Sequence, residues 1–197
     1  MARFSPVIAR NAPENFDLWP VSGGDGPWVH LDGTVDHDDV GAVLCAMYLD
    51  SGGGAARTAD AAVHELIGFD TLFGRGGLLL DGGDGVRAEP GGSDLCEWRT
   101  WLHALHRAPV DLGHPPAPWV EYVADDVVRV WVDEGRDVPH VDVPQRALPA
   151  MLRAAQRDLV DFLGPLRSWA GVHSPRQVEL LVASVDAGLQ ITEPLPL

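Results

Sequence analysis

Hydrophobic positions along the first third of the chain predict two strands and two helices. Short apolar runs indicate strands at Phe4–Ala9 and Pro27–Leu31, separated by a loop rich in Pro, Gly and Asp. A helix is expected over about Asp38–Leu49, where apolar residues recur at spacings of three and four and Asp36 is placed as the N-cap. Thr58 is placed to cap a second, shorter helix.

The middle of the chain predicts a hairpin and a third helix. Gly77–Leu80 and Val86–Ala88 flank a turn rich in Gly and Asp. Asp94, with Glu97 three residues on, is the acidic form of a capping box and predicts a helix over about Leu95–His106. At about 100° per residue, the apolar side chains expected on one face of this helix are Leu95, Trp98, Trp101, Leu102 and Leu105.

The last third predicts a second hairpin followed by two helices. Trp119–Ala124 and Val127–Val132 are β-branched and aromatic, and a third strand is expected near Val141–Val143. Pro144 opens a long helix that Gly164-Pro165 is expected to end or kink, and Ser174-Pro175-Arg176-Gln177 has the form of a helix start. The expected class is α+β, an antiparallel sheet with helices packed on it, ending in two C-terminal helices. We expect one domain over residues 1–197, with 50–57 and 108–118 as the alternative places for a subdivision.

Composition narrows the classes of function. The 197 residues include 14 basic side chains, all of them Arg, and 29 acidic ones, for a formal charge of −15. So negative a chain is a poor binder of phosphate backbones, and we expect no nucleic-acid partner. The absence of Lys excludes a Schiff-base nucleophile. Only Val7, Ile8 and Ala9 precede Arg10 as an apolar run, which is too short for a signal peptide, and no later run reaches membrane-spanning length. We therefore expect a cytoplasmic protein without a membrane partner, in which Cys45 and Cys96 form two separate thiols rather than one disulfide.

The negative charge is concentrated near the N-terminus. Between Arg10 and Arg57 lie eight acids and no base, and the densest part carries Asp32, Asp36, Asp38 and Asp39. A surface of one sign steers a cationic partner toward it. The alternative is a solvated acidic face that serves solubility alone.

Tryptophans are the second candidate binding element. Trp98 and Trp101 share the predicted third helix, and Trp119 and Trp131 lie on the second hairpin. They either line a common core, which is the default for such side chains, or border a groove. Exposed beside acids, Trp98, Trp101 and Trp119 would form a binding site for a cationic partner.

Histidines supply the alternative of a metal-dependent hydrolase. Its candidate ligands are His37, Asp38, His64, Glu65, His103, His106 and His114. His103 and His106 are one helical turn apart, close enough to chelate one ion, and His114 follows nearby. Without Cys-x-x-Cys or His-x-x-x-His spacing, the pattern favours boundary histidines, so we predict no metal site and no cofactor.

Two segments resemble a group of short proteins of high-GC actinobacteria. They are Pro90-Gly91-(x)3-Leu95-x-x-Trp98-Arg99-x-Trp101 and Leu112-Gly113-His114-x-Pro116-x-Pro118-Trp119-Val120-Glu121. The resemblance covers roughly residues 75–170 and implies no established activity. Relatives carry cysteines just after the Pro-Gly, where this chain has Gly92, Ser93 and Asp94. A metal or redox role of those cysteines is therefore missing here.

Three functions of different class follow. We favour an acidic protein-binding module, similar in character to bacterial immunity proteins or regulators, that binds or neutralises a basic protein. The alternatives are the metal-dependent hydrolase and a small-molecule-binding tailoring enzyme with a Trp-lined pocket. The sequence indicates neither a catalytic residue nor an oligomeric state.

Overall fold

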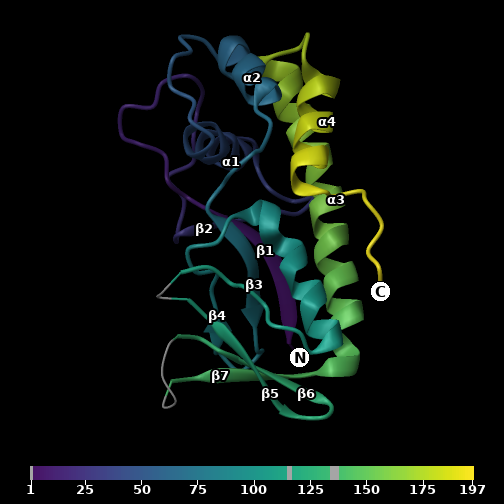
Figure 1. Ribbon diagram of the computed structural model, residues 1–197. Coiled ribbons are helices and arrows are strands. Elements are labelled where there is room, and N and C mark those ends of the chain that lie inside the picture. Colours follow the sequence, from purple (N-terminus) through teal and green to yellow (C-terminus); the bar gives the residue numbers. More distant parts are fainter. Residues whose placement is uncertain (1, 115–116, 134–137) are drawn as a thin grey trace.

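Two antiparallel sheets form the β-structure of the computed structural model, which describes residues 2–114, 117–133 and 138–197 (Figure 1). The first sheet has the order β2-β1-β3-β4, from β1 (Arg3–Ala9), β2 (Trp28–His30), β3 (Gly76–Asp81) and β4 (Arg87–Ala88). The second has the order β5-β6-β7, from β5 (Trp119–Ala124), β6 (Val127–Trp131) and β7 (His140–Pro144). The strands lie where alternation and turn residues predict them, but they divide into two sheets rather than one.

The helices lie between and after these strands in the sequence. They are α1 (His37–Asp50), α2 (Ala59–Gly68), the 3-10 helices η1 (Leu95–His106) and η2 (Gln145–Ala147), α3 (Leu148–His173) and α4 (Val178–Leu189). The α+β class with two C-terminal helices is thereby confirmed. Asp36 and Thr58 are the predicted N-caps, accepting hydrogen bonds from the backbone N–H groups of Asp39 and Ala61. Across the described residues, no helix combines the length and the apolar character that crossing a bilayer requires.

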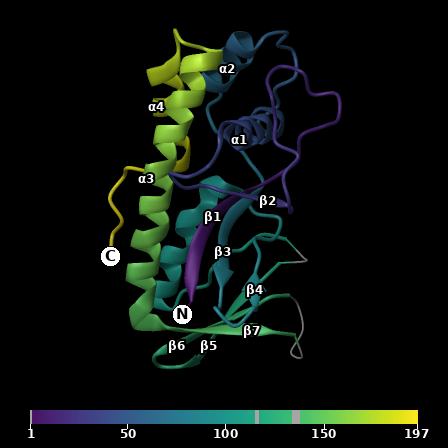
Figure 2. The ribbon, with the colours of Figure 1, turned by 180° about the vertical axis from the view of Figure 1, so that it is seen from behind.

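Helix α3 runs along the whole molecule, from the small sheet at one end to α1, α2 and α4 at the other (Figures 1 and 2). Its buried stripe at spacings of three and four includes Leu159, Phe162, Leu166 and Trp169, and it contacts β1, η1, α1 and α4. Of the two effects predicted for Gly164-Pro165, an end or a kink, the first is wrong, because the helix continues to His173. Pro165 lies inside it, on a partly exposed side where the loss of one backbone N–H is tolerated.

The start of α4 also differs from its prediction. Ser174 does not cap this helix, which begins at Val178 with Gln177 as its N-cap. The Ser174 hydroxyl, fully buried, donates instead to Asp60 at 2.6 Å. Ser174 therefore joins the end of α3 to the first turn of α2.

The third helix is a 3-10 helix of twelve residues, unusually long for this geometry. With three residues per turn, every third side chain is buried, namely Leu95, Trp98, Trp101 and Ala104. Leu102 and Leu105, expected on the same face at 100° per residue, are only partly buried. The predicted capping box is also wrong, because Asp94 makes no capping hydrogen bond and accepts from the N–H of Gly74 instead.

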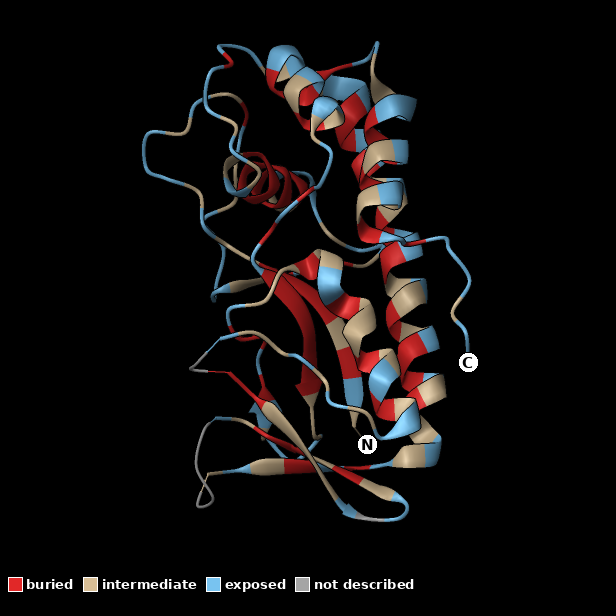
Figure 3. Cartoon of the chain, viewed as in Figure 1, coloured by how far each residue is buried: buried red, intermediate tan, exposed pale blue. Residues whose placement is uncertain are grey.

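Helix α1 is buried along nearly its full length, as the red ribbon in Figure 3 shows. A loop over residues 10–27 covers one side of it, and the loop closes on itself where Arg10 N–H donates to Pro27 O at 2.8 Å. Trp19 anchors the loop, since its indole N–H donates to Gly41 O at 2.8 Å and its ring packs edge-on against Trp169. An added Cβ on Gly41 would lie 2.2 Å from Pro20 O. The loop can lie this close only because residue 41 has no side chain.

Substitution of Gly41 tests this packing. Alanine normally stabilises a helix interior by up to about 1 kcal/mol relative to glycine. Gly41→Ala should instead lower the free energy of unfolding by about 1–3 kcal/mol, because backbone must move to admit the methyl group. Gly171→Ala in α3, where a Cβ meets nothing within 4 Å, is the matched control and should stabilise. Urea unfolding measures both, and equal signs for the two variants would contradict the docking of the loop.

The two cysteines are free thiols, as predicted. Burial is the main cause that raises the pKa of Cys45 to about 12 and that of Cys96 to about 11. Both therefore stay protonated at neutral pH, and thiol reactivity resides in the thiolate.

Labelling with a thiol reagent at pH 8 tests the burial of the cysteines. Cys96 should react about tenfold or more slowly than a free thiol, since its small thiolate fraction outweighs the greater nucleophilicity of a more basic thiolate. Cys45, which is 0% exposed, should react only after unfolding. Rapid modification of either residue in the native protein would contradict the packing described here.

Candidate functional site

An open recess lies where β2 leads into α1, and it gathers most of the predicted acidic residues. Its volume is about 280 Å³. Four carboxylates and one guanidinium line it, belonging to Asp25, Asp32, Asp36, Asp39 and Arg10. We call this feature the acidic recess; its lining is therefore strongly negative.

Hydrogen bonds and one ion pair hold three of the four carboxylates of the acidic recess in place. Asp32 accepts from both the backbone N–H and the hydroxyl of Thr34 at 2.7 Å, which fixes the turn after β2. Asp36 is held as the N-cap of α1, and Asp39 pairs with Arg10. The recess is thus arranged by the fold before any partner arrives.

Two aromatic side chains complete the recess. Trp28 and His30, both on β2, line it beside the acids. The indole nitrogen of Trp28 is buried and has no hydrogen-bond partner among the described residues. Neither residue was predicted for the site, although their position on the strand just before Asp32 is a signal that could have identified them.

The acidic character continues onto α3. Gly33 lies directly against Asp161, so that a Cβ on Gly33 would be 3.2 Å from the Asp161 Cβ. One turn earlier, Asp158 binds Arg3 at 2.8 Å. Asp161 is exposed and adds a carboxylate to this face that sequence reasoning missed, because it is far from Asp32 in the chain.

Asp38 belongs to a different neighbourhood. Burial and the neighbouring His37 lower the pKa of the His173 imidazole, and the nearby carboxylate of Asp38 acts against them. His37 and His173 face each other with 3.0 Å between their Nε2 atoms. The structure therefore brings Asp32, Asp36 and Asp39 together and directs Asp38 toward a histidine pair.

Trp98 and Trp101 belong to the core. They are 1% and 3% exposed; the Trp98 indole donates to Leu189 O at 2.8 Å, and Trp101 packs on Phe4 with 4.6 Å between ring centroids. Both side chains therefore line the core, which was the default expectation for them, and neither offers an exposed face to a partner. Trp119 is partly exposed and stacks on Trp131 at 5.6 Å in the second sheet, so the three predicted tryptophans do not form one surface.

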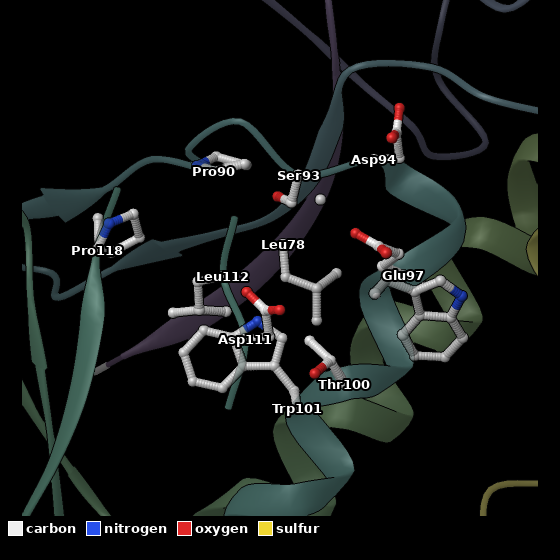
Figure 4. A pocket seen from close by; sticks show the side chains of 13 residues that line it. Leu78, Pro90, Ser93, Asp94, Glu97, Thr100, Trp101, Asp111, Leu112 and Pro118 are labelled. Carbon is white, nitrogen blue, oxygen red and sulfur yellow. The ribbon is translucent and has the colours of Figure 1, made fainter. Parts of the chain in front are cut away.

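A narrow cleft nevertheless lies beside Trp98 and Trp101 (Figure 4). Glu97 and Asp111 turn their carboxyl groups into the space, and Leu78 lies between them. The cleft encloses about 20 Å³, against about 280 Å³ for the acidic recess, which leaves room for about one water molecule. A metabolite of ordinary size does not fit such a space, so the cleft does not support the tailoring-enzyme alternative.

Apart from His37 and Asp38, the candidate metal ligands are scattered. His103 and His106 lie in the exposed row of η1, and the Nδ1 of His103 is 3.2 Å from Pro109 O. His64 contacts Gln177, and His114 pairs through its backbone with Gly92. Within residues 2–114, 117–133 and 138–197, no three His, Cys, Asp or Glu side chains gather around a point where a metal could bind. The contacts therefore do not favour the hydrolase alternative.

The segments that carry the actinobacterial resemblance meet in one place. Pro90, Trp98, Trp101, Leu112 and Pro118 all line the narrow cleft, whereas Pro116 of the second segment lies outside the described residues. Comparison of the chain with protein-family models, with curated proteins and with solved structures finds no match. The resemblance stays a prediction, and any functional conclusion depends on the geometry of the site itself.

Proposed function

We propose that this protein is a binding module, immunity-like or regulatory in character, whose acidic recess receives a cationic group of a basic partner protein. The observation that supports this most directly is the gathering of Asp32, Asp36 and Asp39 around one open space beside Trp28. A guanidinium or ammonium group fits there, because carboxylates supply charge and an indole face adds cation–π attraction.

Preorganisation strengthens such a site. The turn at Asp32 and the cap at Asp36 hold their carboxylates without a ligand, so binding does not have to order them. Arg10 neutralises Asp39 alone, and the remaining carboxylates keep the lining negative. The surrounding excess of acids, with a chain charge of −15, would speed the encounter with a basic surface.

Replacement of two aspartates by asparagine tests the proposal. Asn caps helices and forms Asx turns as Asp does, so Asp32→Asn with Asp36→Asn removes charge while keeping both local structures. The probe is a fluorescein-labelled arginine-rich peptide, followed by anisotropy at low and near-physiological salt. The double variant should bind about fivefold more weakly, as expected for two exposed ion pairs, and with a shallower salt dependence.

The matched control carries the same change of charge elsewhere. Asp125→Asn with Asp126→Asn alters the exposed turn of the β5–β6 hairpin, in the second sheet. This control should bind the peptide as the unaltered protein does. Equal weakening by both pairs would attribute binding to net charge and would overturn the assignment of the recess.

A further inference from the structure

A pair of histidines comes together where the N-terminus of α1 meets the C-terminus of α3. His37 is the first residue of α1 and His173 the last residue of α3, 136 positions apart in the sequence. Their Nε2 atoms are 3.0 Å apart, with 5.1 Å between ring centroids. Trp169 packs on His173 with 4.5 Å between their ring centroids.

Without a metal, the contact between the two Nε2 atoms is a hydrogen bond, in which one ring donates and the other accepts. Among the described residues, neither Nδ1 has a hydrogen-bond partner, whereas the Nδ1 atoms of His64 and His103 lie within 3.3 Å of oxygen acceptors. When a metal ion replaces the shared proton, each ring can therefore carry its own proton on Nδ1 and offer the Nε2 lone pair to the ion.

We propose that His37 and His173 form a two-histidine site for a divalent transition-metal ion, of the class Ni²⁺, Cu²⁺ or Zn²⁺. Imidazole nitrogen is a preferred ligand of these ions, and metal–nitrogen bonds are about 2.0–2.1 Å long. Two such bonds across the observed 3.0 Å subtend an angle of about 90° at the metal, the angle between adjacent ligands of an octahedron.

Two features near the pair attract positive charge. Asp38, the neighbour of His37, places negative charge near His173. The imidazole of His173 also ends α3, where the helix dipole attracts positive charge. His37 is exposed and His173 is partly exposed, so both rings can make the small rotation that turns their lone pairs toward one ion. With no third protein ligand among the described residues, the remaining positions of the metal would be filled by water.

Calorimetric titration with NiCl₂ and, separately, ZnCl₂ tests the site on tag-free protein at pH 7.5. The unaltered protein should bind one ion per chain and unfold at a higher temperature when the ion is present, because the metal stabilises only the folded pair. His37→Ala and His173→Ala should each weaken binding by about tenfold or more. His106→Ala, which removes an exposed histidine from η1, should leave the affinity unchanged.

A second variant separates ligation from folding. His37→Gln keeps a polar group that can hydrogen-bond to His173 but is a much weaker metal ligand, so it should retain the metal-free stability and lose the ion. Equal affinities in His37→Gln and His106→Ala, or the absence of saturable binding in the unaltered protein, would overturn the proposal. Cobalt-induced shifts of two imidazole Nε2 resonances, assigned to His37 and His173, would support it independently of stability.

Discussion

Burial of one side of α3 is the interaction on which the rest of the structure depends. Its stripe of Leu, Phe and Trp side chains packs against β1 and η1 at one end and against α1 and α4 at the other. A helix of 26 residues spans about 39 Å, so one rigid element supports both parts of the fold. The same helix sets the positions of the candidate sites, because Gly33 lies against Asp161 and His37 meets His173. Neither neighbourhood would exist without the packing of α3.

Local chemistry predicted the elements well where a few neighbouring residues decide them. Asp36 and Thr58 cap the helices that they were expected to cap, and the β-branched hairpin around Asp125-Asp126 forms in place. The 3-10 geometry of η1 was not predicted, because the buried residue that completes its spacing of three is the small Ala104, whereas the large Leu102 and Leu105 favour an α-helix. That Pro165 does not end α3 was also beyond local sequence, since tolerance of a proline depends on which side of the helix faces solvent.

The candidate sites were predicted only in part. The acidic stretch identified Asp32, Asp36 and Asp39, because charges that are close in sequence stay close in space across a short loop. Trp98 and Trp101 are in the core, where their size places them. Arg10, Asp161 and His173 come from distant parts of the chain, and only tertiary packing brings them to their partners. The carboxylates of the acidic recess also serve the fold, as turn, cap and ion pair, so an excess of acids in this stretch is partly a structural requirement.

The 3-10 geometry of η1 has a consequence for length. A rise of about 2.0 Å per residue makes twelve residues span about 24 Å, against about 18 Å for an α-helix of the same number. The seven residues of β1, which η1 contacts, extend about 23 Å. Stretched in this way, a short segment presents one straight column of apolar side chains to β1 and β3. The thinner, longer helix thus spans with twelve residues a length that an α-helix would span only with about four more.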